Sequence, residues 1–151
     1  MADELQPVFN IEKLYVKDLS VEVPNAPAIY LEREAPQIDV NMSTESSTLG
    51  ENLYQADITV TVTAKIGDKT MFLVECTEGG IFRIEHVPQD QLPMVLGIGC
   101  PNIVFPYLRE TVSDVVIRAG FPPLLLNPVN FEALFLQQQQ AQQQAVPAQT
   151  H

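Results

Sequence analysis

Hydrophobic and polar residues alternate with a period of two through the first half of the chain, as expected for β-strands that bury one face. Four stretches show this alternation and predict strands: residues 8–23, 38–43, 54–66 and 70–84. Residues 43–52 are rich in Ser and Thr and predict a loop. Gly67-Asp68 predicts a tight hairpin between the last two strands, because such turns need a positive φ.

Two features interrupt this regular alternation. In the first strand Lys13 and Lys17 fall among apolar odd positions, so we expect a bulge or break near Lys17. In the fourth strand Gly79-Gly80 predicts a second bulge. Toward the end of the first strand Asp18 and Glu22 point to one face, about 13–14 Å apart.

The period changes to that of helices in the second half of the chain. Apolar residues from Leu108 to Ala119 recur at helical spacing, with Pro106 in the first turn and Gly120 as the stop. Asn127-Pro128 predicts the N-cap and first turn of a second amphipathic helix. Four strands followed by two helices predict an α+β fold with a four-stranded antiparallel sheet. The uncovered face and edges of this sheet predict an oligomer.

The length of 151 residues predicts one domain, residues 1–136, followed by a Gln/Ala-rich flexible tail at residues 137–151. Two cysteines without CxxC spacing do not make a disulfide framework. The first residues lack the pattern of a signal peptide, and no apolar run approaches the roughly 20 residues of a membrane span. These observations predict a cytoplasmic protein that does not insert into membranes.

The charge is strongly negative, with 19 acidic residues against 8 Lys and Arg and a net charge of −11. Sixteen of the 19 acidic residues precede residue 91. Coulomb repulsion makes nucleic acid an improbable partner. An acidic surface favours a basic partner, although the charge could equally serve only to keep the protein soluble.

Catalytic and metal-binding motifs are not recognisable in the sequence. Cys100 precedes Pro101 in an apolar setting typical of a buried, inert thiol, and Gly97-Ile98-Gly99 lacks the third glycine of a nucleotide loop. We therefore expect no enzyme activity, no cofactor and no metal. Two alternatives stay open: a carrier of a lipid-like small molecule in an apolar groove, and a thiol enzyme that uses Cys100.

Four segments resemble the SecB family of protein-export chaperones: Lys17–Pro27, Gly79–Phe82, Cys100–Glu110 and Phe121–Phe135. The resemblance implies a homotetramer built as a dimer of dimers. It also implies an ATP-independent holdase that keeps precursor proteins unfolded and delivers them to SecA. The zinc-binding, basic C-terminal tail that docks in such complexes belongs to SecA. The tail of this chain departs from the family, because it is neutral where relatives often end in an acidic segment.

The resemblance also implies which residues bind. Carried over by position, the SecA-binding residues are Asp18, Glu22, Leu73 and Glu75, which the strand alternation already places on outward faces. We expect the substrate groove between the sheet and residues 121–136. Its expected lining is Phe72, Val74, Phe82, Leu124, Leu126, Phe131 and Phe135.

Overall fold

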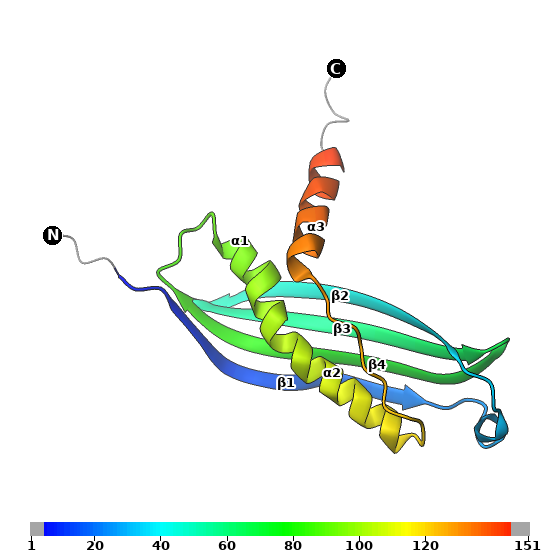
Figure 1. Ribbon diagram of the computed structural model, residues 1–151. Coiled ribbons are helices and arrows are strands. Elements are labelled where there is room, and N and C mark those ends of the chain that lie inside the picture. The colour runs from blue at the N-terminus through cyan, green and yellow to red at the C-terminus, as the bar shows by residue number, and fades with distance from the viewer. Residues whose placement is uncertain (1–4, 146–151) are drawn as a thin grey trace.

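The computed structural model describes residues 5–145 as one antiparallel sheet with helices on one side (Figure 1). The strands are β1 (Val8–Glu22), β2 (Gln37–Gly50), β3 (Leu53–Ile66) and β4 (Lys69–Glu85), in the sheet order β1-β4-β3-β2. The helical elements are the 3₁₀ turn η1 (Ala28–Leu31), α1 (Leu92–Met94), the π-helical turn η2 (Val95–Gly99), α2 (Cys100–Arg118) and α3 (Phe131–Ala145). The predicted α+β fold with a four-stranded antiparallel sheet is confirmed.

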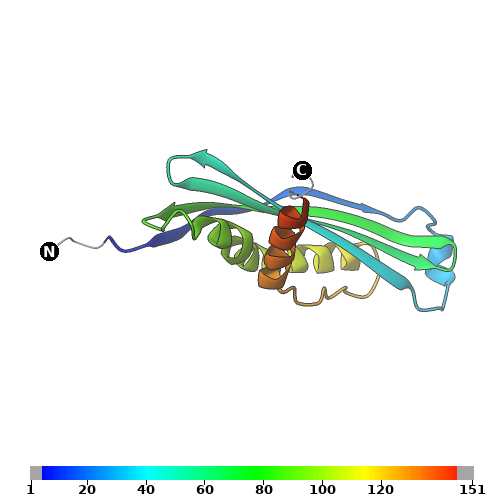
Figure 2. The same cartoon turned by 90° about the horizontal axis from the view of Figure 1, so that it is seen from above.

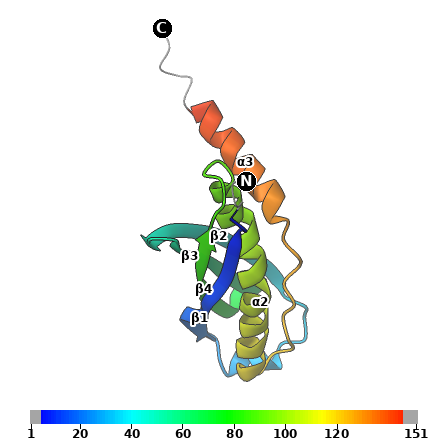
Figure 3. The ribbon, with the colours of Figure 1, turned by 90° about the vertical axis from the view of Figure 1, so that its left-hand side faces the viewer.

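The two faces of the sheet differ in what covers them. α2 crosses one face, which we call the helix-covered face, while no helix of residues 5–145 lies over the opposite, open face (Figures 2 and 3). Side chains at even positions of β3 and β4 point to the helix-covered face, and most of them are buried. They form the core together with α2; its largest fully buried side chains include Phe82, Ile58, Val60, Val62, Val74, Leu108, Val112 and Val116.

The edge strand β2 is longer than the sequence predicted. Its polar second half does not form a loop, because Ser43 pairs with Thr59 and the ladder continues to Thr48 opposite Tyr54. Side chains in this part of an edge strand are largely exposed on both faces, so they need no apolar alternation. The turn that follows contains Asn52 with a φ of 61°, which Asn tolerates better than most residues.

Two of the sheet's bulges lie in β1. The expected irregularity near Lys17 is confirmed, because the pairing of β1 with β4 shifts between Val16 and Asp18, and again between Ile11 and Lys13. The predicted bulge at Gly79-Gly80 is wrong, since β4 keeps a continuous register with β3 through both glycines. These two glycines lie opposite the stretch of β1 between its two bulges.

Helix α2 starts earlier than predicted, because the chain is already helical through α1 and η2. Pro106 therefore lies inside α2 instead of in its first turn, where it removes one backbone hydrogen bond. The predicted stop is confirmed at Gly120, which has a φ of 94°. The hydroxyl of Tyr30 donates a hydrogen bond of 2.6 Å to the Ala119 carbonyl and so ties η1 to this helix end.

Residues 121–130 form an extended crossover that leads from α2 to α3. The predicted N-cap at Asn127 is wrong: the side chain of Asn130 accepts a hydrogen bond of 3.0 Å from the backbone N–H of Ala133. Phe121 and Leu126 are buried, so apolar anchoring holds residues 127–130 extended before the helix begins. α3 projects beyond the sheet and includes residues 137–145 of the predicted tail (Figure 3). Flexibility of that tail stays a prediction, and residues 146–151 lie outside the described range.

Candidate functional site

The four residues expected to bind SecA come together on the open face. Glu22 pairs with Leu73, and Asp18 pairs with Thr77, two positions along β4 from Glu75. Residues directly opposite each other in an antiparallel pair share a face, so Asp18, Glu22, Leu73 and Glu75 lie on one surface. Glu75 is the diagonal neighbour of both β1 carboxylates, at the typical spacing of about 7–8 Å. We call these four residues the acidic patch.

Within residues 5–145 the carboxylates of the acidic patch have no neutralising ion-pair partner. The ion pairs in residues 5–145 join Lys17–Asp57, Lys69–Glu32, Arg83–Glu12 and Arg118–Asp114, and none involves Asp18, Glu22 or Glu75. All three are exposed, whereas Leu73 is half-buried among them. The neighbouring positions on β3 are the neutral Thr61 and Thr63. Three like charges around one aliphatic side chain form a surface that attracts a flexible basic segment.

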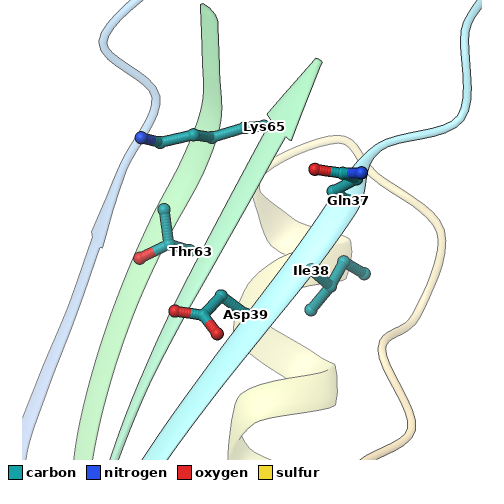
Figure 4. A pocket seen from close by; sticks show the side chains of 5 residues that line it. All are labelled: Gln37, Ile38, Asp39, Thr63 and Lys65. Atoms are coloured by element: carbon teal, nitrogen blue, oxygen red, sulfur yellow. The ribbon is translucent and has the colours of Figure 1, made fainter. Parts of the chain in front are cut away.

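The acidic patch is bounded on the side of β2. Leu73 lies opposite Thr63, which in turn lies opposite Asp39 on β2. Asp39 and Thr63 border a shallow depression together with Lys65, Gln37 and Ile38 (Figure 4). Lys65 makes no ion pair within residues 5–145, so its positive charge opposes the field of Asp39 at this end of the sheet. At this end of the sheet the uncompensated negative charge is therefore centred on β1 and β4.

A row of apolar depressions follows β2 on the helix-covered side. Ile38 borders a cavity of about 340 Å³ with Phe72, Phe121 and Leu124. Further along the same strand lies a second cavity of about 210 Å³, lined by residues that include Val40, Met42 and Leu126. A third cavity of about 440 Å³ follows, lined by residues that include Thr44, Ser46, Leu96 and Phe135. We call this row the β2 groove.

The structure brings only part of the expected groove lining to the surface. Phe72, Leu124, Leu126 and Phe135 border the β2 groove. Phe131 is 2% exposed and packs edge-on against Phe105, with ring centroids 5.8 Å apart, so it supports the groove from behind. Val74 and Phe82 are 1% and 0% exposed. These last two residues are core, and the structure does not place them at an accessible surface.

Sequence reasoning missed the contribution of β2 to this groove. Ile38 and Val40 are each 44% exposed, and with Met42 they form one apolar stripe of the edge strand. The signal was available, because the alternation that predicted this strand puts the three residues on one face. The role of Gly97 was also missed. A Cβ at this position would lie 2.6 Å from the Phe135 ring, so the lack of a side chain at Gly97 lets α3 pack against η2.

The two thiols are enclosed on the helix-covered side. Cys76 and Cys100 are both 0% exposed and free. Burial raises the pKa of Cys100 to about 12, and burial together with the charges of Glu78 and Asp18 raises the pKa of Cys76 to about 12. Both thiols are therefore protonated at neutral pH, which disfavours the thiol-enzyme alternative. Within residues 5–145 no group of three or more His, Cys, Asp and Glu residues could hold a metal ion.

Known proteins share the sequence pattern of this chain. Residues 2–143 match the family model described as preprotein translocase subunit SecB. The chain belongs to the SecB family. It is 84% identical over 152 residues to the protein-export protein SecB of Thiobacillus denitrificans, with 100% of both chains covered. It is 59% identical over 150 residues to the SecB of Methylobacillus flagellatus, with 99% of this chain and 96% of the relative covered.

A solved structure shares the fold at much lower sequence identity. It is a SecB-like chaperone from Mycobacterium tuberculosis in complex with a ChAD peptide from the HigA1 antitoxin. The TM-score is 0.65 at 16% identity, with 80% of this chain and 90% of that chain covered. The family resemblance read from the sequence segments is thus confirmed, and SecB membership gives the chain a chaperone role in protein export. No helix within residues 5–145 is long and apolar enough to cross a membrane.

Proposed function

We propose that this chain is an ATP-independent holdase of the cytoplasm. It binds unfolded segments of precursor proteins in the β2 groove and presents them to SecA through the acidic patch. The observation that carries this proposal is the placement of the two surfaces on opposite faces of one sheet. An apolar ligand in the β2 groove and a basic ligand on the acidic patch do not compete for the same side chains.

The shape of the β2 groove favours an extended polypeptide over a compact small molecule. Its three depressions follow β2 from Ile38 to Ser46, a distance of about 26 Å along a strand. Each apolar side chain buried there contributes about 1.5–3 kcal/mol. Fixing the backbone of an unfolded ligand costs about 1–2 kcal/mol per residue. One groove should therefore bind weakly and with little sequence preference.

Several grooves on one assembly overcome this weakness. β1 is an edge strand, and its apolar side chains on the helix-covered side remain exposed: Phe9, Ile11, Leu19 and Val21 are 38%, 48%, 41% and 36% exposed. A second copy of the chain is the occupant that satisfies both this apolar stripe and the unpaired strand edge. We therefore propose the homotetramer, a dimer of dimers. Linked grooves raise the avidity for one long chain by roughly 10²–10⁴.

The acidic patch fits the basic, zinc-binding tail of SecA. Its carboxylates are exposed, so their attraction for Lys and Arg side chains is modest per pair and depends on salt. Several such pairs around Leu73 give a docking surface that releases its partner readily, as delivery requires. In this proposal the zinc ion enters with SecA, and the patch contacts the basic side chains.

Native mass spectrometry tests the proposal on the full-length chain, alone and with a reduced, unfolded precursor. We expect a mass of about four chains that takes up one unfolded chain and ignores the folded form of the same precursor. A monomer that takes up nothing would contradict the holdase proposal. A tightly held, stoichiometric small molecule that survives purification would support the carrier alternative instead.

A further inference from the structure

Along the first strand, the positions that point to the helix-covered face change twice between odd and even. Phe9 and Ile11 pair with Ile84 and Phe82 on the helix-covered face, so odd residues point inward there. Between the two bulges Leu14 and Val16 take the inward positions, and after the second bulge odd residues point inward again, with Leu19 opposite Cys76. The bulges explain why Lys13 and Lys17 interrupt the alternation in the sequence. Each bulge keeps apolar residues on the covered side of a long strand.

The bulge at Lys17 decides whether the acidic patch exists. If the register of Val16 opposite Glu78 continued without a shift, Asp18 would face Cys76 and Glu22 would face Phe72. Both β1 carboxylates would then point to the helix-covered face, and Leu19 would take the position opposite Glu75. A shift of one residue moves every following side chain to the other face.

A polar cluster on the open face lies beside this bulge. Lys17 Nζ reaches across β4 to Asp57 Oδ2 on β3, at 3.4 Å, and the Gln55 amide donates to the same oxygen at 2.8 Å. Asp57 is only 4% exposed, and its Oδ1 has no hydrogen-bond partner among residues 5–145. A buried carboxylate depends on its cation far more than an exposed one does. Lys17 is itself 55% exposed, so the position of the pair is set by the buried carboxylate of Asp57.

Gly79 makes this long-range contact possible. It lies between Tyr15 and Asp57 in one row of the sheet. A Cβ at this position would lie 2.6 Å from Asp57 Oδ1 and 2.8 Å from the Tyr15 ring carbon Cζ. Any side chain here would push Asp57 and Tyr15 away from the strand between them. The glycine therefore has a steric role, which the sequence pattern had assigned to a bulge in β4.

We infer that the Lys17–Asp57 pair, seated over Gly79, fixes the register of β1 and thereby places Asp18 and Glu22 on the open face. Lys17, Asp57 and Gly79 are positioning residues for the acidic patch and need not touch its ligand. The claim about register stands on the pairing alone; its consequence for SecA binding rests on the proposed function.

Native Cys76 supplies a reporter of this register. In a Cys100→Ala background, Leu19→Cys places a second thiol directly opposite Cys76, at the typical Cα separation of about 4.5–5.5 Å that allows a disulfide. In the shifted register Asp18→Cys would occupy that position instead. Because Cys76 is a slowly reacting thiol, the variants are brought to equilibrium in a glutathione redox buffer, in which glutathione disulfide is the oxidant. Mass spectrometry of the peptides then gives the yield of each disulfide and separates intrachain from interchain bonds.

The reporter is combined with Asp57→Asn, which keeps the shape and removes the charge, and with Lys17→Met. We expect both substitutions to lower the Leu19→Cys disulfide and raise the Asp18→Cys disulfide. In the parent background they should weaken binding of the SecA tail peptide by about tenfold or more and leave uptake of unfolded precursor unchanged. Lys17→Arg should restore the parent result. Glu32→Gln, which breaks an ion pair that includes no residue of β1, is the control and should change neither readout.

Unchanged disulfide yields in Asp57→Asn and Lys17→Met would overturn the inference, even if peptide binding fell. If Asp57→Asn does not unfold cooperatively, Lys17→Met decides, because its side chain is exposed and its loss opens no cavity. Failure of the unsubstituted protein to bind the tail peptide would instead contradict the proposed function. The disulfide yields would still test the register in that case.

Discussion

The open and helix-covered faces of this sheet present their candidate binding residues by different means. On the helix-covered face, α2 and the crossover bury most apolar side chains, and only the strip along β2 stays accessible. On the open face the carboxylates are exposed, and their arrangement follows from which residue of β1 opposes which residue of β4. Packing thus shapes the apolar site, whereas strand register shapes the acidic one. The proposed function therefore assigns ligands of opposite chemistry to the two faces of one sheet.

The largest effect is expected on the open face. Replacing Asp18, Glu22 and Glu75 by Lys reverses the sign of the acidic patch, and we expect binding of the SecA tail peptide to fall by about 100-fold or more. Uptake of unfolded precursor should stay within about twofold, because the β2 groove lies on the other face. Titration calorimetry with each ligand measures both affinities.

Glu51→Lys is the matched control for this charge reversal, since Glu51 is exposed in the turn after β2. Its effect on peptide binding should be small and should vanish as salt rises. Equal loss of peptide and precursor binding in the triple variant would show that the fold, rather than the acidic patch, had been damaged.

A smaller effect is expected in the β2 groove. Val40→Gln places a polar group in the middle depression, and we expect the affinity for unfolded precursor to fall about three- to tenfold per groove. Thermal stability should change little, since Val40 is 44% exposed. Leu49→Gln on the same strand, where Leu49 is 49% exposed, is the control and should bind normally. Equal losses in the two variants would argue against a defined groove.

Glu78 sharpens the comparison, because it is a carboxylate on the helix-covered face. It is 4% exposed, its Oε2 has no hydrogen-bond partner among residues 5–145, and burial, assisted by the charge of Glu110, raises its pKa. A raised pKa means that the folded state holds the proton more tightly than the unfolded chain. Its contribution to stability is therefore present below the pKa of an unfolded Glu and is lost as the pH rises through the folded pKa.

We expect Glu78→Gln to stabilise the protein at pH 8 by about 1 kcal/mol, the scale of one unpaired buried polar group. At pH 4 the substitution should have little effect, since the native side chain is already protonated. Urea unfolding at both pH values measures the difference. If the two proteins differ by the same free energy of unfolding at both pH values, Glu78 does not titrate in the way its raised pKa requires.

The smallest effect concerns the thiols. Because the pKa values of Cys76 and Cys100 are raised to about 12, iodoacetamide should label neither residue in the folded protein at pH 7.5. Both should react at the rate of a free cysteine in denaturant. Rapid labelling of folded Cys100 would reopen the thiol-enzyme alternative.

Much of the fold follows from the sequence pattern, because alternation reports directly which side chains are buried. The strands β3 and β4, their hairpin and the outward direction of Asp18 and Glu22 were predictable in this way. The bulge near Lys17 was predictable too, because Lys17 interrupts the alternation, but the role of Gly79 was not. Gly79 looks like a bulge residue in the sequence, yet its role is to admit Asp57 and Tyr15 from neighbouring strands.

The groove was only half predictable for a related reason. Local apolar character identified Leu124 and Leu126 but could not separate surface lining from core, so it also selected Val74 and Phe82. That distinction depends on where α2 crosses the sheet, which no local pattern contains. The start of α3 was misplaced because Asn127-Pro128 and Asn130 both carry cap chemistry, and tertiary anchoring of the crossover selects Asn130.

The most direct test of the two-face account is the affinity of the SecA tail peptide measured by calorimetry with the groove empty and again with unfolded precursor bound. Independent sites on opposite faces predict the same dissociation constant in both cases, within about twofold. Formation of a ternary complex should be visible in the same sample. Displacement of the precursor by the peptide, or loss of peptide binding once precursor is bound, would contradict the account.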